Sequence, residues 1–109
     1  MNIECIKHIN KDENNRVEYL WKNFDYYDGN DFIAQIFSDE FGMKVDEKID
    51  GIYYGKIKLR GNMAEYHLIW HEDVGNYMYC INQEKKSLEK LEQELSVITE
   101  KLNNMLKDK

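Results

Sequence analysis

Proline is absent from this sequence of 109 residues, and cysteine occurs only twice. Without proline, the ends of helices and strands depend on glycine, asparagine and aspartate. The two cysteines, Cys5 and Cys80, lie in apolar runs, and we expect packed, reduced thiols rather than a disulfide. No apolar run approaches the roughly 18 residues of a membrane span. Residues 1–15 also hold no apolar stretch of signal-peptide length, so we expect a cytoplasmic protein.

The composition is that of a folded protein. Hydrophobic residues make up 42% and aromatic residues 13% of the chain, which excludes a disordered acidic tail. The length is close to the commonest size of one domain, so we predict a single domain over residues 1–109.

The negative charge is concentrated in one segment. Residues 23–50 carry eight acids and two bases, a balance equal to the whole net charge of −6. The charges of the other segments sum to zero. An acidic surface of this kind repels nucleic acid and attracts basic partners.

Helix-like spacing marks the N-terminal part of the chain. Val17, Leu20, Trp21 and Phe24 recur at helical intervals and predict a helix over residues 12–24, whereas residues 2–9 are ambiguous between strand and helix. After a turn at residues 25–30, in which Gly29 can take a positive φ, a second helix is predicted. Asn30 or Asp31 is its expected cap, Phe32, Ile33, Ile36 and Phe37 are its apolar face, and Gly42 follows its end.

Residues 43–81 alternate with period two. Ile57 and Leu59, the run from Ala64 to Trp70, and the run from Tyr77 to Ile81 all read as strands. The breaks at residues 50–51, 60–62 and 72–76 are hairpin signals. We predict a three- or four-stranded antiparallel meander, with residues 43–45 as a possible further edge strand.

The final segment predicts a long helix over residues 83–107. Leu88, Leu91, Leu95, Ile98, Leu102 and Met105 follow an a/d heptad pattern. Such a helix is about 37 Å long, against about 20 Å for a six-residue strand. We therefore expect its distal part (Leu102, Met105, Leu106) to overhang the sheet. Val97 and Leu106 widen the stripe, which favours packing on the sheet over a coiled-coil homodimer, although the last turns remain available to a second protomer.

The histidines do not predict a metal site. His67 and His71 would share a helix face, but on a strand this spacing places them about 13 Å apart, too far for one zinc ion. A restriction-type nuclease site is also disfavoured, because the strand after Asp50 carries Lys56-Ile57-Lys58 without the required carboxylate. We therefore predict no enzyme activity, cofactor or metal, with an enzyme using the histidines as the third-ranked alternative.

Carboxylates and tyrosines gather at two turns. Asp25, Tyr27, Asp28 and Asp31 surround the start of the second helix, and Glu72, Asp73 and Tyr77 lie at or beside the break near residue 74. Asp28 and Asp31 can also have only a structural role, because negative charges at a helix N-terminus interact favourably with the helix dipole. The alternative without a function is an acidic surface that is simply solvated. Tyrosines ringed by charges are typical of protein-binding patches, so we predict these seven residues as the partner-binding site.

The chain resembles the small bacterial immunity proteins that neutralise polymorphic or contact-dependent toxins. The resemblance lies in size, acidity, aromatic strands and the run from Ile69 to Tyr77 (IWHEDVGNY). It implies an inhibitor that binds a basic, nuclease-like toxin, with the acids of the predicted site in place of phosphates.

The combined expectation is an α+β domain: two N-terminal helices, an antiparallel meander and a long C-terminal helix on one sheet face. The predicted function is non-catalytic binding of a basic protein. A small oligomeric scaffold or regulatory subunit, associating through the C-terminal helix, is the alternative.

Overall fold

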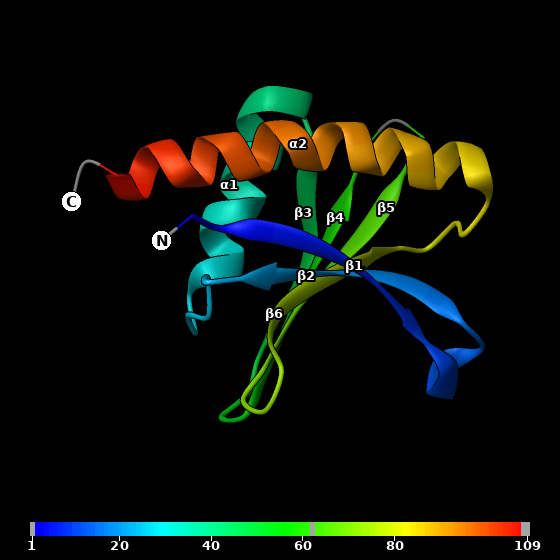
Figure 1. The fold of residues 1–109 in the computed structure, drawn as a ribbon, viewed down its shortest axis with the longest axis horizontal. Helices are drawn as coiled ribbons and strands as arrows, with labels where there is room; N and C mark the ends of the chain where they lie inside the picture. The colour runs from blue at the N-terminus through cyan, green and yellow to red at the C-terminus, as the bar shows by residue number, and fades with distance from the viewer. Residues whose placement is uncertain (1, 62, 108–109) are drawn as a thin grey trace.

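The computed structural model describes residues 2–61 and 63–107. These residues form one six-stranded antiparallel sheet with two α-helices on it (Figure 1). In chain order the elements are β1 Glu4–Asn10, the 3-10 turn η1 Lys11–Glu13, β2 Arg16–Lys22, α1 Gly29–Phe41, β3 Lys44–Asp50, β4 Tyr54–Arg60, β5 Glu65–His71, β6 Gly75–Cys80 and α2 Lys85–Lys107.

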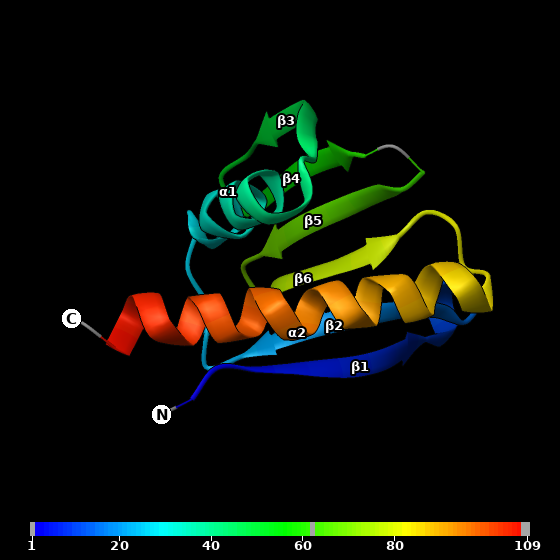
Figure 2. The same ribbon diagram turned by 90° about the horizontal axis from the view of Figure 1, so that it is seen from above.

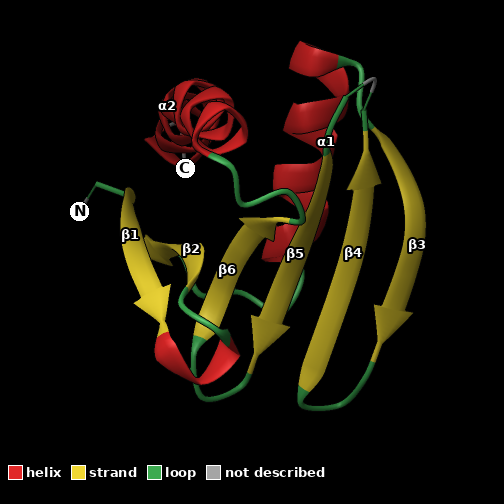
Figure 3. Cartoon of the chain, turned by 90° about the vertical axis from the view of Figure 1, so that its right-hand side faces the viewer, coloured by secondary structure: helices red, strands yellow, loops and turns green. Residues whose placement is uncertain are grey.

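The sheet has the strand order β1-β2-β6-β5-β4-β3. The chain makes the β1–β2 hairpin, crosses through α1 to the far edge, and returns by the meander β3-β4-β5-β6 until β6 pairs with β2 (Figure 2). Both helices cover the same face (Figure 3). Phe37 of α1 packs on Tyr66 of β5, and Glu94 of α2 accepts a hydrogen bond from the hydroxyl of the same tyrosine.

The prediction of a first helix over residues 12–24 is wrong, because the N-terminal segment is a β-hairpin. Residues 16–22 form β2 and pair in register with β1, from Glu4 opposite Lys22 to Asn10 opposite Arg16. Tyr19 and Trp21 point into the core at period two. The connection bends at Asn14 and Asn15, with φ of 56° and 60°, which asparagine tolerates better than most residues.

The second predicted helix is confirmed as α1. Gly42 follows its end with φ of 66° and donates its N–H to carbonyls of the last turn. The predicted caps are wrong, since the helix begins at Gly29 with Asp28 in the cap position and no side-chain cap bond. Gly29 is therefore helical and is not one of the glycines with positive φ.

The meander is confirmed, with β3 as its outer strand. β3 pairs with β4 through an irregularity between Val45 and Glu47. Residues 44–50 form a full strand where the alternation of residues 43–45 predicted a short one. In the predicted break at residues 60–62, Asn62 lies outside the described residues.

The C-terminal helix lies across the sheet, as predicted. Leu91, Leu95 and Ile98 are buried beneath it. Leu102 is also buried, contrary to the predicted overhang, because the helix continues over the core around Phe24. Met105 is exposed. Neither helix, over the described residues, is long and apolar enough to cross a membrane.

Candidate partner-binding surface

Three connections meet at one end of the sheet. Since every strand pair is antiparallel, β2, β3 and β5 run in the same direction, and the segments that follow them leave the same end. These segments, residues 23–28, 51–53 and 72–74, are called the loop-end surface below. The N–H of Glu72 donates to the carbonyl of Tyr53 over 3.1 Å, which joins two of them, and they lie side by side in Figure 1.

The third connection is held by Asn76 at the start of β6. This side chain is 1% exposed. Its Oδ1 accepts the N–H of Tyr26 over 2.9 Å, and its Nδ2 donates to Oδ1 of Asn30 over 3.1 Å. A Cβ on Gly29 would lie 2.8 Å from the Phe24 ring and 3.0 Å from Asn76, so only glycine fits here. The loop at residues 23–28 therefore has a fixed path against β6.

Trp70 completes this scaffold. Its indole Nε1 donates to the carboxylate of Asp25 over 3.2 Å. The ring of Tyr27 packs on the Trp70 ring edge to face, with centroids 5.2 Å apart. The Asp25 carboxylate also lies close to Gly75, whose φ of +95° turns the chain into β6. These contacts bring the predicted residues Asp25 and Tyr27 to the turn that carries Glu72 and Asp73.

The loop-end surface exposes large apolar side chains. Ile52 is 81% exposed, Tyr53 63% and Tyr27 56%, with Tyr26 and Val74 close behind. The ring of Tyr26 packs edge to face against Phe24. There it borders an apolar cleft of about 330 Å³ together with Phe32 and Met105.

The charged residues within the three segments are all acidic, while Lys48 and Lys56 border Tyr27 from β3 and β4. The loop-end surface contains four carboxylates and no lysine or arginine. Over the described residues, no ion pair involves Asp25, Asp28, Glu72 or Asp73. Asp31 differs, because Lys48 of β3 pairs with it at 2.8 Å. Four of the predicted acids thus lie unpaired among exposed aromatic residues, and the fifth is neutralised within the chain.

Tyr77 lies outside the loop-end surface. It points to the helix-free face of the sheet, opposite Leu20 of β2 and Ile69 of β5. Burial raises the pKa of Tyr77 to about 12. Tyr77 is therefore a half-buried residue of the sheet and is not one of the exposed residues of the loop-end surface.

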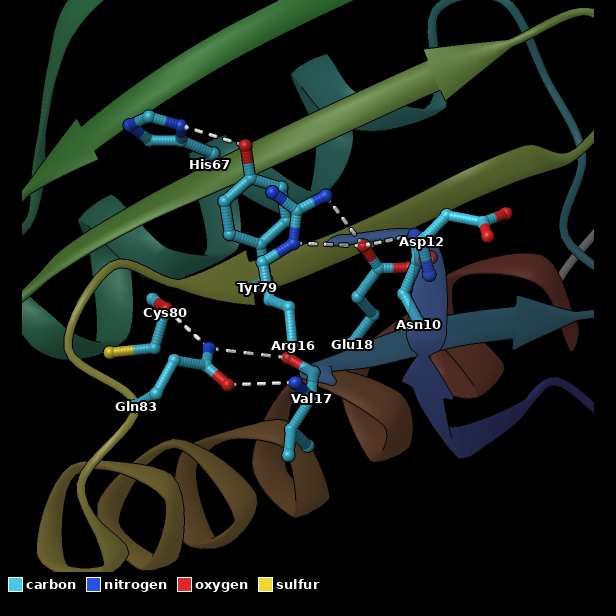
Figure 4. A network of polar contacts seen from close by, with 9 residues as sticks. All are labelled: Asn10, Asp12, Arg16, Val17, Glu18, His67, Tyr79, Cys80 and Gln83. Carbon is cyan, nitrogen blue, oxygen red and sulfur yellow. Dashed lines mark hydrogen bonds and ion pairs between the residues drawn. The ribbon is translucent and has the colours of Figure 1, made fainter. Parts of the chain in front are cut away.

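The helix-free face carries a separate polar network (Figure 4). The guanidinium of Arg16 lies 3.7 Å from the centroid of the Tyr79 ring and pairs with the buried Glu18 at 2.6 Å. Nδ1 of His67 is 3.2 Å from the Tyr79 hydroxyl, and Nε2 is 3.1 Å from Glu65. Because a carboxylate only accepts, Nε2 carries the proton and Nδ1 accepts from the tyrosine.

No metal centre is assembled from these groups. His67 and His71 lie four residues apart on the same side of β5. In the part of the chain that the structure describes, no three histidine, cysteine, aspartate or glutamate side chains are placed to hold a metal ion. Cys5 and Cys80 are free, and burial raises the pKa of both thiols, that of Cys5 to about 12.

Sequence reasoning missed four contributors to the loop-end surface. Ile52 and Tyr53 follow the Asp50-Gly51 break and carry no charge, so the charge pattern did not mark them. The alternating pattern predicts Trp70 only as a strand residue, and the predicted break at residues 72–76 includes Asn76, which is buried in the structure. The usable signal was topological: in a meander, the turns after alternate strands share one end of the sheet.

Comparison with known proteins does not add to this description, because no protein-family model, curated protein or solved structure matches the chain.

Proposed function

We propose that this protein is a non-catalytic binding module that holds a basic protein, a nuclease-like toxin, at the loop-end surface and thereby inhibits it. One observation carries the proposal: four carboxylates, for which the described residues form no ion pair, share three adjoining segments with the exposed Tyr27, Ile52 and Tyr53, and these segments contain no lysine or arginine. Apolar and aromatic anchors within a charged rim are the usual arrangement of a protein-binding site.

The charges and the anchors have different tasks in such a complex. Asp28, Glu72 and Asp73 are exposed, so they attract a basic partner during approach and raise the association rate. The exposed rings and Ile52 supply the apolar area that leaves water on contact. In a nuclease, the carboxylates occupy positions that the phosphates of a nucleic acid would otherwise take.

The rigidity of the surface favours binding as well. Asn76, Trp70 and Gly29 fix the loop at residues 23–28 before a partner arrives. A site that is already ordered loses less conformational entropy on association.

The alternative function, assembly through the heptad stripe of α2, has less support. Leu91, Leu95, Ile98 and Leu102 are buried in the core of the same chain. A coiled-coil seam would require these side chains to leave the sheet.

The test begins with the full chain as bait in an extract of its native cells, eluted by increasing salt. The expected partner is a basic protein whose nuclease activity is lost on adding an equimolar amount of the chain. Amide exchange in the purified complex is expected to slow at residues 23–28, 51–53 and 72–74. An acidic partner, or protection confined to other segments, contradicts the proposal.

A further inference from the structure

The two edges of the sheet are built differently. β3, at one edge, carries five charged residues in seven and is interrupted by an irregularity between Val45 and Glu47. Charges and bulges of this kind block the addition of another strand. β1, at the other edge, carries only Glu4 and Lys7 as charges, pairs with β2 without interruption, and exposes Ile6 and Ile9.

The hydrogen bonds of two side-chain amides reveal which backbone groups of β1 face outward. Asn103 of α2 accepts the N–H of Ile3 over 2.8 Å and donates to its carbonyl over 3.1 Å, so both groups of Ile3 point away from β2. Since a strand alternates with period two, the backbone groups of Cys5, Lys7 and Ile9 point the same way.

β2 gives the same assignment independently. Gln83 accepts the N–H of Val17 over 2.7 Å and donates to its carbonyl over 3.4 Å, on the side away from β1 (Figure 4). The neighbours Glu18 and Leu20 therefore point toward β1, where they pair with His8 and Ile6. The groups of Cys5, Lys7 and Ile9 remain on the open edge.

A groove of about 700 Å³ runs along this edge between β1 and α2. Its apolar floor includes Ile3, Cys5 and Leu95. Three carboxylates and one lysine border it: Glu4, Glu92, Glu100 and Lys7. Lys7 pairs with Glu92 at 3.2 Å, and over the described residues no ion pair is formed by Glu4 or Glu100.

We propose that β1 and this groove bind an extended segment of a partner protein, in which apolar and basic residues alternate, as an additional strand of the sheet. The segment pairs with the outward backbone groups of Cys5, Lys7 and Ile9. On the face that α2 covers, the alkyl stems of its basic side chains cross the groove floor, and their charges reach Glu100 and share Glu92 with Lys7. Its apolar side chains lie on the opposite face, beside the exposed Ile6. Main-chain pairing gives affinity and the groove gives selectivity. This site is separate from the loop-end surface and does not depend on it.

A second copy of the chain fits the groove less well. In an antiparallel pair centred on Lys7, this lysine would meet its own equivalent. The face of α2 that borders the groove is polar, with Glu92, Ser96 and Glu100, and would offer a second α2 only like charges. A basic strand meets opposite charges instead.

The experiment uses the full chain, labelled for amide exchange, and a short synthetic peptide in which lysine and valine alternate. In the free protein, the amides of Cys5, Lys7 and Ile9 are expected to exchange quickly, and those of Ile6 and His8, which face β2, slowly. The peptide is expected to slow the exchange of the first three. A peptide of alternating glutamate and valine is the control and is expected to have no effect.

Two variants locate the binding site. Ser96→Trp fills the groove from an exposed position of α2 and is expected to weaken peptide binding about tenfold or more. Gln93→Trp adds the same side chain to the same helix outside the groove and is expected to leave binding unchanged. Lys7→Pro removes one outward N–H and the ion pair with Glu92, but none of the pairs with β2, and it is expected to abolish the protection of the Cys5 and Ile9 amides.

Three results overturn the proposal. The first is no protection of Cys5, Lys7 and Ile9 by the lysine–valine peptide. The second is equal weakening by both tryptophan variants. The third is protection of these amides in the free protein that increases with its concentration, which would make a second copy the occupant. Lysine substitution of Asp28, Glu72 and Asp73 is expected to leave peptide binding intact, so failure of this proposal is distinguishable from failure of the loop-end surface.

Discussion

The indole Nε1 of Trp70 donates to the carboxylate of Asp25 across 3.2 Å, between the end of β5 and the loop that precedes α1. The contact joins segments 45 residues apart in sequence. It gives Asp25 a structural task in addition to its charge. Among the described residues, the side chains of Asp28, Glu72 and Asp73 make no such bond, so their charges can be changed without breaking a side-chain hydrogen bond, although Asp28 also lies at the N-terminus of α1, where a negative charge is favourable.

Asn76 is expected to be essential for the position of the loop at residues 23–28. Asn76→Ala leaves the N–H of Tyr26 and the amide oxygen of Asn30 without their partner. The free energy of unfolding should fall by about 1–3 kcal/mol, the cost of buried groups without a hydrogen bond. Urea unfolding measures the change. Asn104→Ala, at an exposed position of α2, is the control, and an equal effect of both substitutions would contradict the assignment.

The packing of α2 on the sheet makes a second quantitative prediction. Leu95 is 3% exposed, so Leu95→Ala should lower the free energy of unfolding by about 2–5 kcal/mol through lost burial and a cavity. Met105→Ala, in the same helix but 44% exposed, should cost much less. Denaturant unfolding followed by circular dichroism compares the two variants. A small loss at Leu95 would show that the helix is not part of the core.

His67 predicts a pH dependence of stability. Burial lowers the pKa of His67 from its ordinary value near 6.5, despite the opposing hydrogen bond to Glu65. The unfolded chain therefore binds a proton at a higher pH than the folded chain does. As the pH falls from about 7 to 5, protonation of the unfolded chain lowers the free energy of unfolding.

Glutamine at position 67 cannot titrate in this range. The free energy of unfolding of His67→Gln should therefore depend less on pH between pH 7 and 5. Chemical unfolding at a series of pH values measures it. His8→Gln, at an exposed position of β1, should retain the wild-type dependence. Identical pH profiles for wild type and His67→Gln would exclude His67 as the responsible group.

The sequence was sufficient for α1, α2 and the meander because each has one clear period. The heptad steps of α2 occur only in a helix, and the alternation from Ala64 to Trp70 only in a strand. The segment around Val17 was ambiguous, since Val17, Leu20 and Trp21 satisfy helical spacing while Val17, Tyr19 and Trp21 satisfy strand spacing. Pairing with β1 decided the outcome, and pairing over such a distance has no local signal.

The candidate site was predictable in part for the same reason. Charges close in sequence identified the acids of residues 25–31 and 72–73, and the fold places Asp25 against Gly75 beside the second group. The face to which the Tyr77 side chain points follows from the register of the sheet, and the sequence alone does not determine that register. Ile52 and Tyr53 belong to the loop-end surface only because the turn after β3 lies at the same end of the sheet as the turn after β5.

Association kinetics with the basic partner test the central proposal most directly. The triple variant Asp28→Lys, Glu72→Lys, Asp73→Lys reverses exposed charges of the loop-end surface without touching Asp25 or Asn76. The control variant Asp12→Lys, Asp39→Lys, Glu89→Lys makes the same change of net charge at exposed positions elsewhere. We expect the loop-end variant to associate about tenfold or more slowly and with a weaker salt dependence. The control should remain close to wild type, and equal rates for the two variants would contradict the loop-end surface as the binding site.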